Sequence, residues 1–312
     1  AHSNLVPTAS RKSACGRNVE ETLSLVDMLK MKLLKEKFNS KEFKDAHASY
    51  FDHRDLLLRL IENVYEYIPD DEKKIAGELN ENVTNFIWTV RLLNLFKIQG
   101  KILKKPGKEG PDIIIQDGNK DILIECVVPQ NWEAKNESTN YYNSYHEENK
   151  ILKYTSSIHD KSKQYTKWIE NRKVNNESPF IIAISGELQT MSDVHTGYPD
   201  IFKAVYPLGK SFYSVSLNDP VDYTISHDVR AFVTNKNIAE ISTNTFLDDK
   251  MEQISGIIFN PYGYLQNSIT DLNSYLVIEN YKRKNNFPSD IIKGSKYYSV
   301  TEDYAIEIKH VD

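Results

Sequence analysis

The sequence predicts a mixed α/β fold in which helices flank a β-sheet, with a helical N-terminal extension before it. Two observations lead to this fold class. Apolar residues recur at helical spacing through about the first 97 residues, and after that they run in short stretches bounded by turn residues. The predicted order of a helix, three strands, a helix and a strand is typical of a mixed sheet with helices on its faces.

The N-terminal part of the chain is expected to be helical. Residues 1–18 are polar and aperiodic, which is typical of a poorly ordered leader. Helices are predicted over 20–38, 54–68 and about 72–96. Because Pro69 and Asp70 end the second helix, we divide the chain there into a helical extension, 1–70, and a main domain, 71–312.

Strands are predicted where the helical period stops. They are expected over 97–104, 112–116, 121–128 and 180–185, with weaker signals at 213–217, 254–259 and 275–278. Asp117-Gly118, between the second and third of these, is a strong hairpin signal. Residues 130–150 are rich in Asn, Glu, Ser and Tyr and predict a long surface loop, after which a helix is expected over about 151–172.

Composition restricts the class of protein. Of the 312 residues, 40% are hydrophobic and 27% are charged, so the chain can bury a core and does not resemble a disordered one. We expect no membrane partner, because no apolar stretch approaches the length of a spanning helix and the N-terminus lacks a signal-peptide layout. The only two cysteines, Cys15 and Cys126, make no disulfide framework, so a reducing, cytoplasmic setting is the default expectation.

The charge pattern allows a local nucleic-acid groove. The net charge of −5 argues against coating nucleic acid non-specifically, but binding depends on where the charges lie. The segment 150–173 contains seven Lys or Arg residues and two acidic residues, and the segment 101–108 contains four lysines and no acidic residue. A solvated helix face with an exposed turn explains these segments equally well. The candidates for nucleic-acid contacts are Lys104, Lys105, Lys163 and Lys167.

Two acidic residues lie at the open end of the predicted hairpin, one on each strand. Asp112 begins the first strand, and Glu125 lies near the end of the second, with three apolar residues before it and three after it. A tight turn brings these strand ends side by side. A carboxylate in an apolar strand is costly unless something compensates it. A divalent cation such as Mg²⁺, which prefers oxygen ligands, would do so, and a structural lysine is the alternative.

The segments Pro111-Asp112 and Glu125-Cys126-Val127 resemble the motif of the PD-(D/E)XK nuclease superfamily. That motif is Pro-Asp, a short hairpin, then Asp or Glu, any residue, and Lys. The superfamily core runs helix, three strands, helix, strand, and about 75–190 of this chain follows that order. The resemblance therefore implies a restriction-endonuclease-like mixed β-sheet flanked by helices. The longer layout is also similar to a group of uncharacterised bacterial proteins of this type.

The resemblance also implies the members of a metal site. Asp112 and Glu125 would bind Mg²⁺ or Mn²⁺, assisted by the backbone carbonyl of Cys126. An acidic residue on the preceding helix would complete the set, and Glu78 and Glu81 are the candidates.

Val127 departs from the superfamily pattern, which has a lysine there that orients water and stabilises charge on the phosphorane. Three explanations are open. In the first, the lysine has migrated to Lys161, one helical turn before Gln164, and superfamily members often carry a glutamine on this helix. In the second, two cations act without a lysine. In the third, the site is inactive and the fold is retained for binding.

The resemblance implies a metal-dependent endonuclease that hydrolyses phosphodiester bonds of DNA. Asp112, Glu125, Lys161 and Gln164 are the expected catalytic residues. Many enzymes of this fold work as dimers, so a homodimer is one further partner that the resemblance allows. The alternative is a catalytically inactive nuclease-fold module that binds nucleic acid or a protein, and a weaker third hypothesis is a secreted toxin or effector built on the same core.

Other polar clusters favour plainer interpretations. His47 and His53 with Asp52 and Asp55 match no single helical face, so a surface turn is favoured over a metal cluster. Asp193 and His195 have no evident nucleophile beside them. Tyr141, Tyr142 and Tyr145 could stack on unpaired bases, but packing against the domain is the favoured interpretation.

Overall fold

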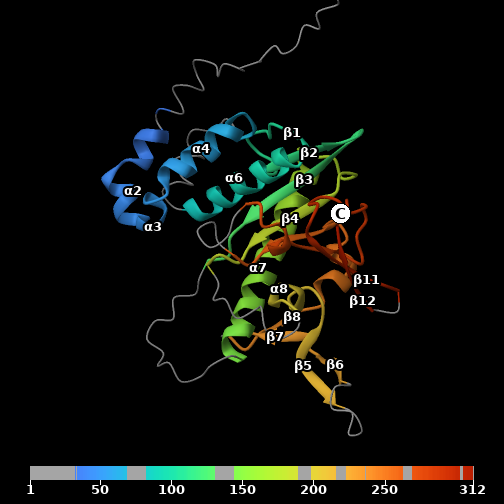
Figure 1. The fold of residues 1–312 in the computed structure, drawn as a ribbon. Coiled ribbons are helices and arrows are strands. Elements are labelled where there is room, and N and C mark those ends of the chain that lie inside the picture. Colours follow the sequence, from blue (N-terminus) through green and yellow to red (C-terminus); the bar gives the residue numbers. More distant parts are fainter. Residues whose placement is uncertain are drawn as a thin grey trace, which may run out of the picture.

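The computed structural model of the protein describes residues 32, 34–68, 82–130, 144–188, 198–215, 223–235, 237–262, 269–302 and 305–311. Within them the chain forms one eight-stranded mixed sheet with helices on both faces (Figure 1). The predicted mixed α/β class is therefore confirmed. The leader over 1–18 and most of the helix predicted over 20–38 lie outside the described residues.

Short helices precede the sheet. They are α2 (Lys41–Ala46), α3 (Ala48–Phe51), α4 (Arg54–Val64) and the 3-10 turn η1 (Tyr65–Tyr67). α4 confirms the helix predicted over 54–68, because it buries Leu57, Ile61 and Val64 at helical spacing. These three side chains belong to the same hydrophobic cluster as Ile113 of the sheet, so α4 packs directly on the main domain. The division at residue 70 stays a prediction.

The next helix, α6 (Val83–Ile98), is buried along most of its length. It confirms the end of the helix predicted over 72–96, whereas 69–81 lie outside the described residues. The strand predicted over 97–104 is wrong in its first half, since β1 spans only Ile102–Lys104. The reason is Gly100, which adopts a φ of +71° and lets Lys101 N–H donate to the Phe96 carbonyl, closing the helix there.

Three antiparallel strands follow α6, as predicted. They are β1, β2 (Ile113–Asp117) and β3 (Lys120–Val127). The tight turn between β2 and β3 relies on Gly118, whose φ of +57° is a conformation that glycine adopts without strain.

Helix α7 (Ser144–Glu170) crosses from β3 to β4 (Phe180–Ser185), which pairs parallel to β3. β4 has the predicted bounds. α7 begins seven residues before 151, so the surface-loop prediction is wrong for 144–150. These polar turns are stabilised by ion pairs of Glu147 and Lys150 with residues far along the chain, which no local apolar period reveals. No described helix, α7 included, combines the length and apolarity needed to cross a bilayer.

The remaining strands complete the sheet on the side of β4 away from β3. They are β9 (Gly256–Asn260), β10 (Leu276–Glu279), β11 (Lys296–Val300) and β12 (Ile306–His310), in the order β1-β2-β3-β4-β9-β10-β11-β12. β9 pairs parallel to β4, β10 antiparallel to β9, β11 parallel to β10, and β12 antiparallel to β11. The weak signals at 254–259 and 275–278 correspond to β9 and β10. β11 and β12 were not predicted.

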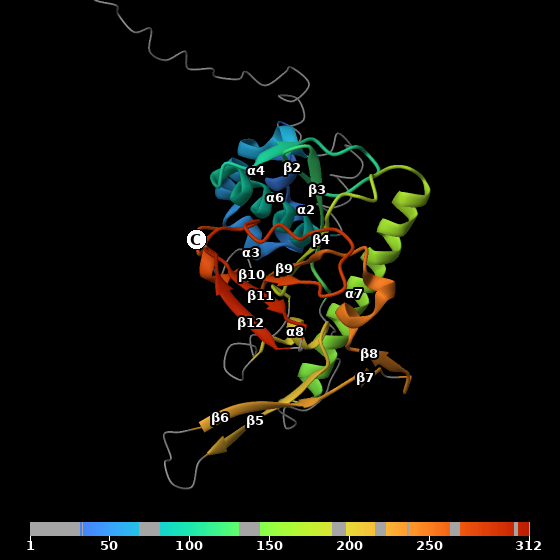
Figure 2. The same ribbon diagram turned by 90° about the vertical axis from the view of Figure 1, so that its right-hand side faces the viewer.

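Smaller elements lie between β4 and β10. They are α8 (Asp200–Lys203), the pairs β5 (Leu208–Val215) with β6 (Tyr223–Val229) and β7 (Phe232–Thr234) with β8 (Glu240–Ser242), and the 3-10 turns η2 (Thr245–Leu247), η3 (Asp249–Met251) and η4 (Leu272–Ser274). The signal at 213–217 overlaps β5. The β5–β6 hairpin extends away from the main sheet (Figure 2).

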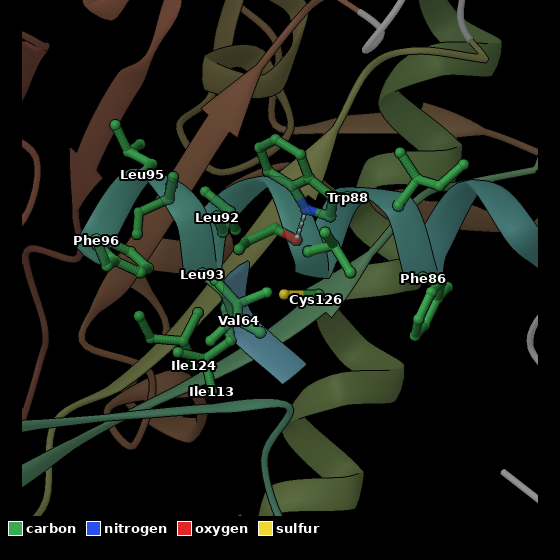
Figure 3. Close-up of a cluster of buried hydrophobic side chains, with 14 of the residues drawn as sticks. Val64, Phe86, Trp88, Leu92, Leu93, Leu95, Phe96, Ile113, Ile124 and Cys126 are labelled. Atoms are coloured by element: carbon green, nitrogen blue, oxygen red, sulfur yellow. Dashed lines mark hydrogen bonds between the residues drawn. The ribbon is translucent and has the colours of Figure 1, made fainter. Parts of the chain in front are cut away.

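Each face of the sheet has its own hydrophobic core. On the α6 side, Ile113, Ile124 and Cys126 face Trp88 and its neighbours (Figure 3). The Trp88 Nε1 donates to the Ala183 carbonyl at 3.0 Å, which ties α6 to β4. On the α7 side, the rings of Tyr165 and Phe180 stack nearly parallel with centroids 4.1 Å apart. Because side chains alternate along β3, Leu123, Glu125 and Val127 face α7.

Truncating the centre of the sheet tests this packing. Ile182 is fully buried in β4, so Ile182→Ala should lower the free energy of unfolding by about 2–5 kcal/mol. Ile102 is 62% exposed on the edge strand β1, and Ile102→Ala should change the same quantity by less than about 0.5 kcal/mol. Chemical denaturation measures both. Equal losses would contradict the assignment of β4 to the sheet interior.

His159, half-buried on α7, should make stability pH-dependent. Burial lowers the pKa of its imidazole below the ordinary 6.5, and the charge of Lys163 lowers this pKa further. The folded protein therefore binds this proton less readily than the unfolded chain does. The contribution of His159 is complete above pH 6.5 and is lost as the pH falls below that value. In urea denaturation, His159→Gln should lose less stability on acidification than the wild type does, and parallel pH profiles would contradict this.

Candidate functional site

Asp112 and Glu125 lie side by side, as the hairpin predicted. The register pairs Ile113 with Ile124, and one further step sets Asp112 opposite Glu125. Both residues are buried, at 8% and 4% exposure, on the sheet face that α7 covers. Cys126 points the other way, toward α6 (Figure 3).

The backbone of Cys126 holds the Asp112 carboxylate in place. The Cys126 N–H donates to Asp112 Oδ2 at 2.9 Å. In an extended strand the carbonyl of a residue points to the same neighbouring strand as its N–H, so the Cys126 carbonyl also faces the Asp112 side. Continuing the β2–β3 register two residues beyond Ile113–Ile124 would set Cys126 opposite Pro111, which has no N–H to donate to that carbonyl. The two carboxylates thus lie at the end of β3, and strand geometry directs the Cys126 carbonyl toward the Asp112 side.

Lys161 and Gln164 of α7, the helix that covers this face of the sheet, both contact Glu125. Lys161 Nζ lies 2.7 Å from Glu125 Oε1, and Gln164 Nε2 donates to the same oxygen at 3.1 Å. Gln164 Oε1 in turn accepts from Lys161 Nζ at 3.3 Å. The two residues sit one turn apart on α7, which lets both side chains reach one carboxylate. A closed ring of three hydrogen-bonded side chains results.

The carboxylate of Glu125 keeps Lys161 charged. Burial by itself lowers the pKa of the Lys161 amine, but the charge and hydrogen bond of Glu125, with a contribution from Asp112, outweigh that effect and raise the pKa above its ordinary value. The ammonium therefore partly neutralises two neighbouring carboxylates.

Val127, in the position of the motif lysine, is half-buried and packs against the hydrophobic cluster under α7. It brings no charge to the site. One of the three explanations for Val127 is that the lysine has migrated to position 161. Lys161 does contact the site, because its Nζ lies 2.7 Å from Glu125 Oε1. The two-cation and inactive-site explanations stay hypotheses.

The donor set suits a hard cation. Mg²⁺ is commonly held by one or two carboxylates, with waters and substrate phosphates completing its coordination. Asp112, Glu125 and the Cys126 carbonyl match that requirement. No group of three or more His, Cys, Asp or Glu residues with metal-binding geometry occurs in the described segments. Glu78 and Glu81, the expected additional ligands, lie outside those segments.

The predicted nucleic-acid contacts fall into two groups. Lys163 and Lys167 are exposed on α7, and Lys163 Nζ lies 3.8 Å from Asp160. Lys104 and Lys105 are exposed at the end of the edge strand β1. The charge of Lys104 is matched by Asp121 at 2.7 Å, a pairing that the sequence analysis missed because the two residues lie on different strands.

The other polar clusters carry no site in the described residues. His47 ends α2 and its ring lies 5.1 Å from that of Phe43, a packing role. Tyr145 belongs to the first turn of α7, not to the predicted loop. The remaining members of the two other clusters lie outside the description: Tyr141, Tyr142, Asp193 and His195.

A second ionic cluster, which the sequence analysis missed, surrounds the start of α7. Lys203 Nζ lies 3.3 Å from both Asp200 and Glu147, Lys150 lies 3.5 Å from Asp200, and Arg230 pairs with Glu147. Lys150, Lys203 and Asp200 are buried. The cluster joins α7, α8 and the end of the β5–β6 hairpin, so it positions the helix that carries Lys161. Its members are spread over more than 80 residues, which leaves no local signal.

Comparison with known proteins adds no family: no family model, curated protein or solved structure matches the chain. The geometry of the site therefore carries the functional argument.

The ring of Glu125, Lys161 and Gln164 should be energetically coupled. Lys161→Met leaves a buried carboxylate without its cation, and we expect it to lower the free energy of unfolding by about 1–3 kcal/mol. Adding Glu125→Gln to the same chain removes that charge and should recover part of the loss. Urea denaturation of the two single variants and the double variant measures the coupling. If the two single effects simply add, the pair does not interact as described.

Proposed function

We propose that the protein is a metal-dependent endonuclease that hydrolyses phosphodiester bonds of DNA. The observation that carries this proposal is the position of Lys161, whose Nζ lies 2.7 Å from Glu125 and thereby supplies the charge that Val127 lacks. Asp112, Glu125 and Lys161 would together supply the two carboxylates and the lysine of a PD-(D/E)XK site, with the lysine coming from α7 and not from position 127.

The order of elements supports a restriction-endonuclease-like core. α6, β1, β2, β3, α7 and β4 follow one another as helix, three strands, helix and strand. The strands β1 to β3 are antiparallel neighbours, and β4 joins β3 in parallel after the α7 crossover. This arrangement brings the end of β3 and the middle of α7 together, where the four expected catalytic residues lie.

The described residues of the site have roles that their contacts support, and Glu78 and Glu81 enter the proposal through the motif alone. Asp112, Glu125 and the Cys126 carbonyl would hold Mg²⁺ or Mn²⁺, with Glu78 or Glu81 completing the set. Such an ion activates water and neutralises charge on the leaving oxygen. Lys161 would stabilise the negative charge that develops on the scissile phosphate. Gln164 would position Lys161 and Glu125 relative to each other through its two hydrogen bonds.

The substrate would be held through its phosphates. Lys163 and Lys167 are exposed on the outer face of the helix that carries Lys161. They would contact backbone phosphates where the substrate passes over that face. Lys104 and Lys105 would extend this track along β1. A homodimer would provide one site for each strand of a duplex.

A catalytically inactive binding module is the second candidate. The observation that favours it is the ion pair itself: Lys161 already compensates the buried Glu125 charge, so the fold does not need a metal ion to be stable. In this case the basic residues of α7 would bind nucleic acid without cleaving it, or another surface of the domain would bind a protein.

Plasmid nicking with Mg²⁺ or Mn²⁺ distinguishes the two candidates. Asp112→Ala, Glu125→Ala and Lys161→Ala should each lower the cleavage rate by about 10²-fold or more, because each removes a charge from the reacting centre. Asp117→Ala, an exposed carboxylate on the same hairpin, is the matched control and should cut like the wild type.

Cleavage that persists unchanged in Asp112→Ala and Glu125→Ala would exclude this site. Retained binding without cleavage of duplex DNA, single-stranded DNA or RNA would favour the binding module. Faster cleavage of RNA than of DNA would correct the substrate class and leave the site assignment intact.

A further inference from the structure

We infer that Lys161 is an internal counter-cation, which occupies Glu125 until a divalent cation binds and is then displaced from it. The inference rests on the proposed function, since it concerns the same site. Glu125 would bind Lys161 and the metal ion in turn. The protein would therefore bind the metal ion more weakly than the same site without Lys161.

The burial of Glu125 explains why the protein needs a counter-cation of its own. The Glu125 side chain is only 5% exposed, and an uncompensated carboxylate at such a depth opposes folding. Lys161 Nζ compensates it at 2.7 Å from Oε1. The protein can thus fold at any metal concentration, with Lys161 in the place of an ion.

The two cations cannot share the carboxylate without repulsion. Mg²⁺ binds carboxylate oxygens at about 2.1 Å. With the ammonium 2.7 Å from Oε1, an ion on the same oxygen would lie at most about 5 Å from Nζ. Like charges at this distance repel strongly where water is largely excluded. The ion bears twice the charge of the ammonium and also gains Asp112, so it is the lysine that moves.

Gln164 can hold the ammonium of Lys161 after it leaves Glu125. Gln164 Oε1 already accepts from Lys161 Nζ at 3.3 Å, while the amide of the same side chain donates to Glu125. Lys161 is 20% exposed, four times as much as Glu125, so its flexible stem can turn outward while Gln164 keeps hold of the ammonium. The freed ammonium would then be available to a substrate phosphate.

Metal titration of the whole chain tests this competition without measuring cleavage. By calorimetry, Lys161→Met should bind Mn²⁺ on the order of tenfold tighter than the wild type. Without metal its melting temperature should be lower, and saturating Mn²⁺ should raise it by more than in the wild type. Lys161→Arg keeps the charge and should stay close to the wild-type affinity. Lys120→Met removes an exposed lysine from the far end of β3 and should bind Mn²⁺ like the wild type.

A second measurement uses the unmodified protein, in case Lys161→Met does not fold. An amine-acylating reagent, followed by mass spectrometry, reports how available each lysine is. Lys161 should be acylated faster with Mg²⁺ than without it, because it has left Glu125, whereas the exposed Lys120 should react at the same rate in both conditions.

The outcomes separate this inference from the proposed function. If Lys161→Met and the wild type bind Mn²⁺ equally, or if Mg²⁺ leaves the acylation rate of Lys161 unchanged, the counter-cation role is wrong and the metal site stands. If neither protein binds Mn²⁺, and Glu125→Ala changes nothing, the metal site fails and the proposed function fails with it.

Discussion

The charge of Glu125 is the constraint on which the site depends. A carboxylate 4% exposed in an apolar strand requires a cation, and the chain provides Lys161 of α7, 36 residues further on. One turn of α7 presents both Lys161 and Gln164 to this carboxylate at the end of β3. The position of Asp112 follows from the same strand through the β2–β3 register.

α7 is held at both of its ends, which gives the site a rigid frame. The stacked rings of Tyr165 and Phe180 fix its C-terminal half on β4. The cluster around Lys203 fixes its first turns to α8 and the end of β6. Lys161 lies between these two anchors, so its ammonium is positioned by elements that are themselves well packed. A polar site on a rigid element is the arrangement that catalysis or specific binding needs.

Much of the fold could be predicted because its signals are local. The α4 period, the Gly118 turn and the apolar run of β4 each lie within a few residues, and the structure contains all three. The failures have different causes. The first turns of α7 are stabilised by ion pairs with residues distant in the chain. β12 pairs with the nearby β11 but is largely exposed and has no long apolar run. The strand expected from residue 97 is wrong because α6 continues to Ile98 and Gly100 closes it.

The sequence by itself determined that Asp112 and Glu125 meet, since a tight hairpin with alternating side chains leaves no other arrangement. It also identified Lys161 and Gln164 as residues sharing one helix face. Only the tertiary structure decided that this face lies over Glu125, and that Lys104 is matched by Asp121 instead. The physical reason is that ion pairs have no period along the chain. The packing of helices and strands decides which lysine meets which carboxylate, and no local sequence pattern reveals it.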